Sequence, residues 1–93
     1  MNRTYALEMT RRAERALRGL GEDIQDEVRA AIRQLAAAPR PPGCKKVRGP
    51  ASLYRIRVRD HRVIYRVEDV RLLVIIIEIG HRREIYRRGL KGG

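Results

Sequence analysis

The chain has 93 residues, of which 43% are hydrophobic and 35% are charged, and its formal net charge is +11. We expect a chain of this length to form one domain with one modest core, and its composition suits a compact soluble protein better than a disordered one. The longest apolar run, Leu72 to Ile77, is far shorter than the roughly 20 residues that a membrane helix needs. With no apolar leader at the N-terminus, we expect one domain over residues 1–93, a cytoplasmic location and no membrane partner.

The positive charge is concentrated in the second part of the chain. Residues 1–38 hold seven arginines and six acidic residues, whereas residues 39–93 hold fifteen basic and five acidic residues, so the net charges are +1 and +10. This asymmetry favours a polyanionic partner, most often nucleic acid, and the alternative is a merely solubilising surface.

Metal and cofactor sites are not predicted. Cys44 is the only cysteine, which rules out an internal disulfide and fits a structural or surface thiol in a reducing compartment. No phosphate-binding glycine loop and no cluster at metal-ligand spacing is present. The acidic residues of the second part are scattered among arginines, at Asp60, Glu68, Asp69, Glu78 and Glu84.

The first part predicts one strand and two helices. Alternation predicts a strand from Arg3 to Met9, and Thr10 is a suitable N-cap for the helix that follows. Apolar positions of that helix recur at Ala13, Ala16, Leu17 and Leu20. After Gly19 and Gly21, a second helix is predicted from about Glu22 to Ala38, with a buried stripe of Ile24, Val28, Ala31, Ile32 and Leu35. Pro39 stops it.

The second part predicts a basic loop over residues 44–50 and then three strands. In the first strand, Arg55, Arg57 and Arg59 alternate with apolar residues, so they share one exposed face. Asp60-His61 forms a turn, and the second strand runs from Arg62 to Glu68.

The last strand is predicted by an aliphatic sequence. After a turn at Glu68-Asp69, the run from Val70 to Ile79 indicates a central strand covered on both faces. Gly80 ends this strand, and a short basic tail follows. The order is β-α-α-β-β-β, an α+β fold with a small, mostly antiparallel sheet packed on an N-terminal helical hairpin.

A basic sheet face suits metal-free RNA cleavage, in which the substrate's own 2′-hydroxyl attacks the phosphate. Arginine can stabilise charge on the transferring phosphate because its planar fork holds two oxygens and stays charged. A base and an acid must come from other side chains. The titratable candidates in this part are His61, His81, Tyr86, Lys45 and Lys46.

Three segments carry a family resemblance: KKVRG, YRIRVRDHRVIYRV and GHRREIY. With the element order, they make residues 3–88 resemble the RelE/ParE superfamily of bacterial and archaeal toxins, and the RelE branch in particular. That resemblance implies a type II toxin that enters the A site of the 70S ribosome and cuts mRNA without a metal. It also implies a cognate antitoxin that wraps the toxin.

The resemblance also implies roles for individual residues. Arg62 and Arg82 would stabilise the phosphate, and Tyr86 would stack on or orient a nucleotide. The strand pair that is lysine in well-known RelE enzymes is Arg55 and Arg57 here. Charge stabilisation survives this change, but base catalysis does not, because arginine does not lose its proton.

Toxins related to this family place a histidine near the C-terminus as an acid or base, and His81 lies in that region. By this resemblance His81 is our candidate for proton transfer, and reliance on positioning and electrostatics is the alternative. Basic residues expected to bind RNA or the ribosome are Lys45, Lys46, Arg48, Arg59 and Arg83.

Two other functions remain open from the sequence. One is a ParE-type toxin that inhibits DNA gyrase by binding it, without nuclease activity. The other is a non-catalytic RNA-binding module that uses the basic sheet face.

Overall fold

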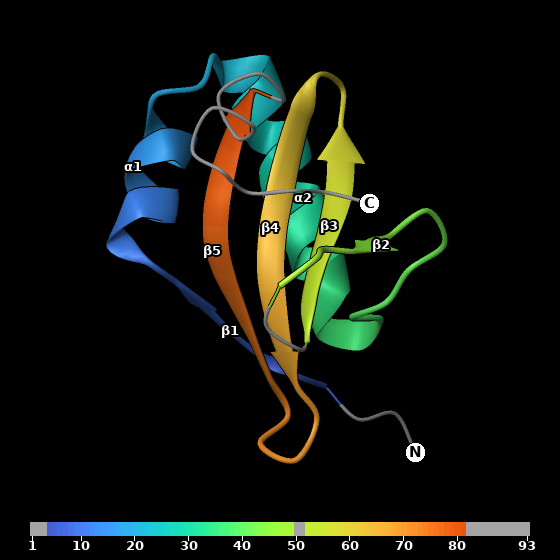
Figure 1. Cartoon of the computed structure of the whole chain (residues 1–93). Helices are drawn as coiled ribbons and strands as arrows, with labels where there is room; N and C mark the ends of the chain where they lie inside the picture. The colour runs from blue at the N-terminus through green and yellow to red at the C-terminus, as the bar shows by residue number, and fades with distance from the viewer. Residues whose placement is uncertain (1–3, 50–51, 82–93) are drawn as a thin grey trace.

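The computed structural model describes residues 4–49 and 52–81, which form two helices on one five-stranded sheet (Figure 1). The elements are β1 (Ala6–Met9), α1 (Arg11–Arg18), α2 (Glu22–Ala37), β2 (Lys45–Lys46), β3 (Leu53–Val58), β4 (His61–Glu68) and β5 (Leu73–His81). The strand order is β1-β5-β4-β3-β2, with β1 parallel to β5 and the other neighbours antiparallel. The predicted α+β fold is confirmed.

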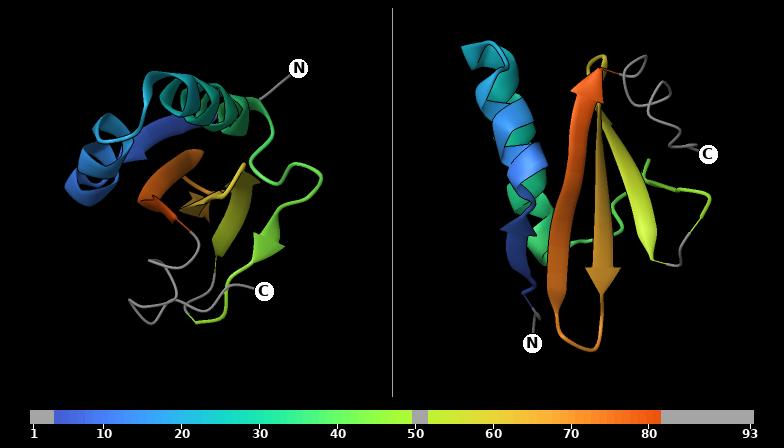
Figure 2. Two further views of the ribbon diagram at one scale, coloured as in Figure 1. Left: turned by 90° about the horizontal axis from the view of Figure 1, so that it is seen from above. Right: turned by 60° about the vertical axis from the view of Figure 1, so that its left-hand side comes forward.

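Both helices cover the same face of the sheet, as Figure 2 shows. The main core fills the space between these layers, because the apolar stripes of both helices meet one face of the central strands. Its buried members include Ala13, Leu17, Val28, Ile32, Leu35, Val63, Tyr65, Val67, Val74 and Ile76. Apart from partly exposed Ala16, Leu20, Ile24 and Ala31, the helical residues predicted to be buried are buried.

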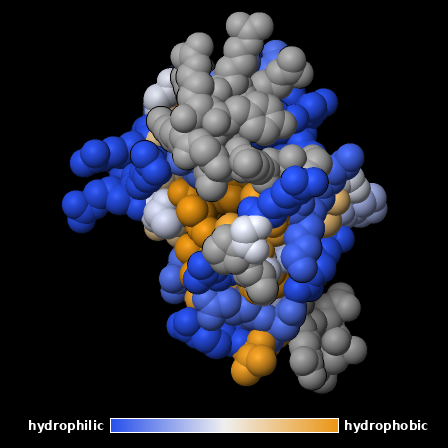
Figure 3. All heavy atoms as spheres, viewed as in Figure 1, coloured by the Kyte–Doolittle hydropathy of each residue, from blue (hydrophilic) through white to orange (hydrophobic). Residues whose placement is uncertain are grey.

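A second, smaller cluster lies on the opposite face of the sheet, which we call the open face. Ile64 belongs to it and alternates with Val63 and Tyr65 of the main core, so its side chain points away from the helices. Val47 and Leu53 join it, and Ile77 packs against it. Figure 3 shows hydrophobic side chains in the middle of this face, between hydrophilic ones. Burial on both faces explains the nearly unbroken aliphatic sequence of β5.

Thr10 anchors the first helix to the sheet. Its Oγ1 accepts a hydrogen bond from the backbone N–H of Ala13 at 3.1 Å, which confirms the predicted N-cap. The same hydroxyl donates to the carbonyl of Ile77 at 2.8 Å. A second hydrogen bond joins the two helices: the Gln25 side-chain amide donates to the backbone carbonyl of Leu17 at 3.0 Å. These contacts fix the helical hairpin against β5.

The last hairpin turns later than the sequence predicts. β5 begins at Leu73, so Val70 lies in the turn, where it is 99% exposed. Leu73 pairs with Glu68 on one side and Ala6 on the other, and this double pairing sets where the strand starts. Gly80 also fails to end β5, because it pairs with Arg62 inside the ladder.

The predicted basic loop contains the short edge strand β2. Gly43 follows two prolines and adopts φ +90°, a conformation that glycine takes without a steric penalty. The chain then turns back along β3, so that Lys45 pairs with Arg55 and Lys46 with Tyr54.

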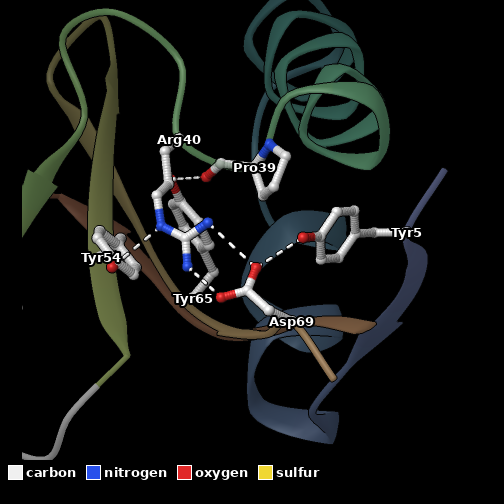
Figure 4. Close-up of polar contacts among 6 residues, drawn as sticks. All are labelled: Tyr5, Pro39, Arg40, Tyr54, Tyr65 and Asp69. Atoms are coloured by element: carbon white, nitrogen blue, oxygen red, sulfur yellow. Dashed lines mark hydrogen bonds and ion pairs between the residues drawn. The ribbon is translucent and has the colours of Figure 1, made fainter. Parts of the chain in front are cut away.

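A polar cluster around Arg40 joins four distant segments of the chain (Figure 4). Arg40 Nη1 and Nη2 donate to the two Asp69 carboxylate oxygens at 3.2 and 2.7 Å, and Arg40 Nε donates to the Tyr54 hydroxyl at 3.1 Å. The Tyr5 hydroxyl donates to Asp69 Oδ1 at 2.6 Å. These bonds from Arg40, and then from Tyr5, hold the pKa of Asp69 below its usual value. The α2–β2 connection is thereby tied to β3, to the β4–β5 turn and to the segment before β1.

We expect Asp69→Asn to destabilise the fold at neutral pH but not in acid. Because the folded-state pKa of Asp69 is lowered, its stabilisation is complete above the unfolded value of about 3.9 and is lost as pH falls through the folded value. Urea unfolding of both proteins across this pH range measures the difference. Glu8→Gln, which neutralises an exposed carboxylate on β1, is the control. A difference that persists in strong acid would attribute the effect to packing and not to charge.

Candidate functional site

Basic side chains gather on the open face of the sheet, across β2, β3 and β4. Arg57 of β3 lies directly opposite Arg62 of β4, and Arg55 lies between Lys45 of β2 and Ile64 of β4. Residues directly opposite each other in an antiparallel ladder point to the same face. Since Ile64 belongs to the open-face cluster, all four basic residues point away from the helices.

These four residues line one pocket of about 370 Å³, which we call the basic pocket, together with Gly43. Arg55 and Arg62 are only 7% and 6% exposed, whereas Arg57 and Lys45 are exposed. Two guanidinium groups are therefore held inside the fold, and two exposed cations lie beside them.

The pocket suits an anion. No acidic side chain lines it in the described part of the chain. Guanidinium groups stay charged at every physiological pH and bind phosphate oxygens in pairs, so three arginines and a lysine around one pocket are suited to binding a phosphate. Among residues 4–49 and 52–81, no three His, Cys, Asp or Glu side chains are grouped so that they could hold a metal ion.

The prediction that Arg59 continues the row of Arg55 and Arg57 is wrong. β3 ends at Val58, and Arg59 turns the chain with φ +54°. Its side chain reaches α2 behind the sheet, where Nε and Nη2 donate to the two carboxylate oxygens of Glu27 at 3.0 and 2.6 Å. This ion pair raises the pKa of Arg59. The period-two pattern fails at Arg59 because the turn begins one residue earlier than predicted.

Two other expected binding residues also lie outside the basic pocket. Lys46 pairs with Tyr54, which packs against the main core, so Lys46 points to the helix side of the sheet. Arg48 is exposed in the loop after β2 and does not line the pocket. By contrast, the sequence places Lys45 only in a loop. The sequence feature that could have predicted the place of Lys45 at the pocket is Gly43 after two prolines, because Gly43 lets the chain turn back along β3.

His81 lies on the face opposite the basic pocket. It pairs with His61 at the ends of β5 and β4, with ring centroids 5.8 Å apart. Both imidazoles line a different pocket, of about 580 Å³, together with Arg12, Arg15 and other α1 residues. The alternation that places Arg62 on the open face places His61 on the helix side. The structure therefore does not bring the predicted proton-transfer residue to Arg55, Arg57 or Arg62.

Arg82, Arg83 and Tyr86 lie outside the described residues, so their predicted roles stay predictions. Within the described ranges, neither helix is both long and apolar enough to cross a membrane.

Comparison with known proteins places this arrangement in a family. The family model of the ParE toxin of the type II toxin–antitoxin system parDE matches residues 7–86. The chain belongs to this toxin family. Its sequence is also similar to the mRNA interferase toxin RelE of Escherichia coli strain K12, with 29% identity over 91 residues, which covers 94% of this toxin and 95% of that protein.

Solved structures of RelE proteins resemble this toxin in fold. The isolated E. coli RelE toxin superposes with a TM-score of 0.74 at 28% identity, covering 91% of this toxin and 94% of that chain. The RelE–RelB complex from Pyrococcus horikoshii OT3 gives a TM-score of 0.77 at 26% identity, and the match covers 85% of this toxin and 96% of that chain. The predicted membership of the RelE/ParE superfamily and the predicted RelE-like fold are confirmed.

We expect a short DNA oligonucleotide to raise the melting temperature of this toxin, with a smaller rise for Arg57→Gln. A ligand at about 100 times its Kd stabilises the folded state by about 2.7 kcal/mol, and loss of one phosphate-binding cation weakens that binding. DNA lacks the 2′-hydroxyl, so binding is measured without cleavage. Arg33→Gln removes an equal charge from the exposed side of α2 and is the matched control. Equal losses in the two variants would mean that net charge, and not the basic pocket, binds the oligonucleotide.

Proposed function

We propose that this toxin is a ribosome-dependent mRNA endonuclease, which cuts the codon in the A site and so inhibits translation. The observation that carries the proposal is the basic pocket of Lys45, Arg55, Arg57 and Arg62, which has no described acidic lining residue. Similarity over nearly the whole chain to a protein named mRNA interferase toxin supports it.

The pocket fits the electrostatic demands of this reaction. As the 2′-oxygen attacks the phosphorus, negative charge grows on the non-bridging oxygens, and fixed cations at that point lower the barrier. Arg62 and Arg57 are assigned to this charge because they lie opposite each other on one face. Arg55, buried beside them, adds a third fixed charge. No metal is required, since the substrate supplies the nucleophile. From the sequence, Arg82 and Tyr86 complete the assignment as a further phosphate ligand and a nucleotide-orienting group.

The proposed partners follow from the charge of this surface. In the cell, the toxin is assigned to the cytoplasm, where the ribosomal A site supplies mRNA and surrounding RNA phosphates. Lys45 and Arg57, the exposed cations of the pocket, are suited to these contacts. A cognate antitoxin is proposed as the silencing partner, as in the RelE–RelB complex of the P. horikoshii relative. An acidic wrapping segment would complement the net charge of +11.

A gyrase inhibitor is the second candidate, because the matching family model is that of the ParE toxin. Such a protein needs a binding surface but no arrangement of cations around one phosphate. The basic pocket therefore favours the nuclease.

One experiment separates the candidate functions. Purified toxin is added to 70S ribosomes programmed with a defined mRNA, and the mRNA ends are mapped. In parallel, DNA supercoiling by gyrase is assayed with the same protein. Cuts in register with the A-site codon support the nuclease, whereas intact mRNA with blocked supercoiling supports the gyrase inhibitor. RNA binding without either effect supports a non-catalytic module.

We expect Arg57→Ala to lower single-turnover cleavage by about 10²- to 10³-fold, which is typical when one fixed transition-state donor is removed. Ribosome binding should fall much less, because the other cations of the basic pocket remain. The matched control is Arg33→Ala, which removes the same charge from α2 and should leave the cleavage rate unchanged. If cleavage and ribosome binding fall equally in Arg57→Ala, Arg57 is a docking residue.

A further inference from the structure

Lys45 differs chemically from the other charged residues of the basic pocket. Its neighbours there are three arginines, which do not lose their protons in proteins, whereas a lysine amine can. We propose that Lys45 is the proton-transfer residue of this site and takes the proton from the attacking 2′-hydroxyl. This inference rests on the proposed nuclease function and fills the role that arginine cannot take at positions 55 and 57.

The path of the backbone places Lys45 at the pocket. Gly43, with φ +90°, turns the chain so that Lys45 pairs directly with Arg55 at the edge of the sheet. Because of this pairing, the side chain of Lys45 points to the open face, as the side chains of Arg57 and Arg62 do. Lys45 is exposed, so its long side chain can reach a phosphodiester that the three guanidinium groups hold.

The imidazoles, the thiol and the phenols of the described residues are placed elsewhere. His61 and His81 line the pocket beside α1, on the helix side of the sheet. Tyr54 and Cys44 pack against the main core. Tyr65 is buried there, and its hydroxyl donates to the carbonyl of Pro39 at 2.7 Å. Burial also raises the pKa of Tyr65, which makes it a poorer proton donor.

The proposed step balances with groups already present. The neutral amine of Lys45 accepts the proton of the 2′-hydroxyl, and the 2′-oxygen forms a bond to phosphorus. The bond between phosphorus and the 5′-oxygen breaks, and that oxygen takes a proton from water. The products are a 2′,3′-cyclic phosphate and a 5′-hydroxyl, with Lys45 left as an ammonium ion that returns its proton to solvent.

Lys45→Arg is the decisive variant because it keeps the positive charge and replaces the amine with a guanidinium group, which does not become a neutral base. We expect single-turnover cleavage on programmed ribosomes to fall by about 10²- to 10⁴-fold, the usual contribution of a general base, while ribosome binding stays unchanged. In the wild type, the cleavage rate should rise with pH until the amine has lost its proton. The groups that face Lys45 are Arg55, Arg57 and Arg62, which keep their charge over this range, so the rise should disappear in Lys45→Arg.

Chemical rescue provides a second measurement. In Lys45→Ala, added ethylamine should restore part of the cleavage rate, whereas tetramethylammonium, a cation without a transferable proton, should not. The melting temperature of each variant checks that the fold is retained. Equal rescue by both cations would reduce Lys45 to an electrostatic role.

The outcomes separate this inference from the proposed function. If the wild type cuts mRNA and Lys45→Arg cuts equally well, the assignment of Lys45 is overturned and the nuclease stands. The same holds if His81→Gln, and not Lys45→Arg, removes the pH dependence. If the wild type does not cut ribosome-bound mRNA at all, the nuclease function and the role of Lys45 are both rejected.

Discussion

The basic pocket depends on the apolar helix–sheet core, which holds like charges together on one face of a small sheet. Arg57 and Arg62 lie directly opposite each other, and like charges in such a position destabilise a strand pair. The cost is roughly the 0.2–1 kcal/mol that a favourable cross-strand pair contributes. Val63, the next residue in β4, is fully buried on the opposite face. Burial of one such side chain contributes about 1.5–3 kcal/mol. The apolar helix–sheet core behind the arginines therefore outweighs their repulsion and keeps them in place.

Three carboxylates of the described residues pair with arginines outside the basic pocket. Glu27 binds Arg59, Asp69 binds Arg40, and Glu78 contacts Arg12 at 3.5 Å. None of these acidic residues lines the basic pocket. These three ion pairs fasten the Arg59 turn, the α2–β2 connection and α1 to the sheet.

The α2–β2 connection gives the pocket its shape. The Arg40 cluster fixes the start of the α2–β2 connection, and Gly43 then turns that connection toward β3. Lys45 reaches the arginines only because of this path. In the proposed mechanism, Arg55 and Arg57 supply charge for a phosphate, and Lys45 on the neighbouring edge strand supplies the amine that arginine lacks.

The sequence by itself determined the helices, the α+β order and the basic face, because each depends on a local period: 3.6 for residues such as Val28 and Ile32, and two for Arg55 and Arg57. Only the tertiary structure decided where the hairpins turn, and with that the placement of Arg59, Val70 and His81. These positions depend on which residues pair across strands, such as Leu73 with both Ala6 and Glu68, and a one-residue shift moves a side chain to the other face. The local pattern of a strand does not specify its partners, so it could not show that His81 faces α1 or that Lys45 faces the arginines.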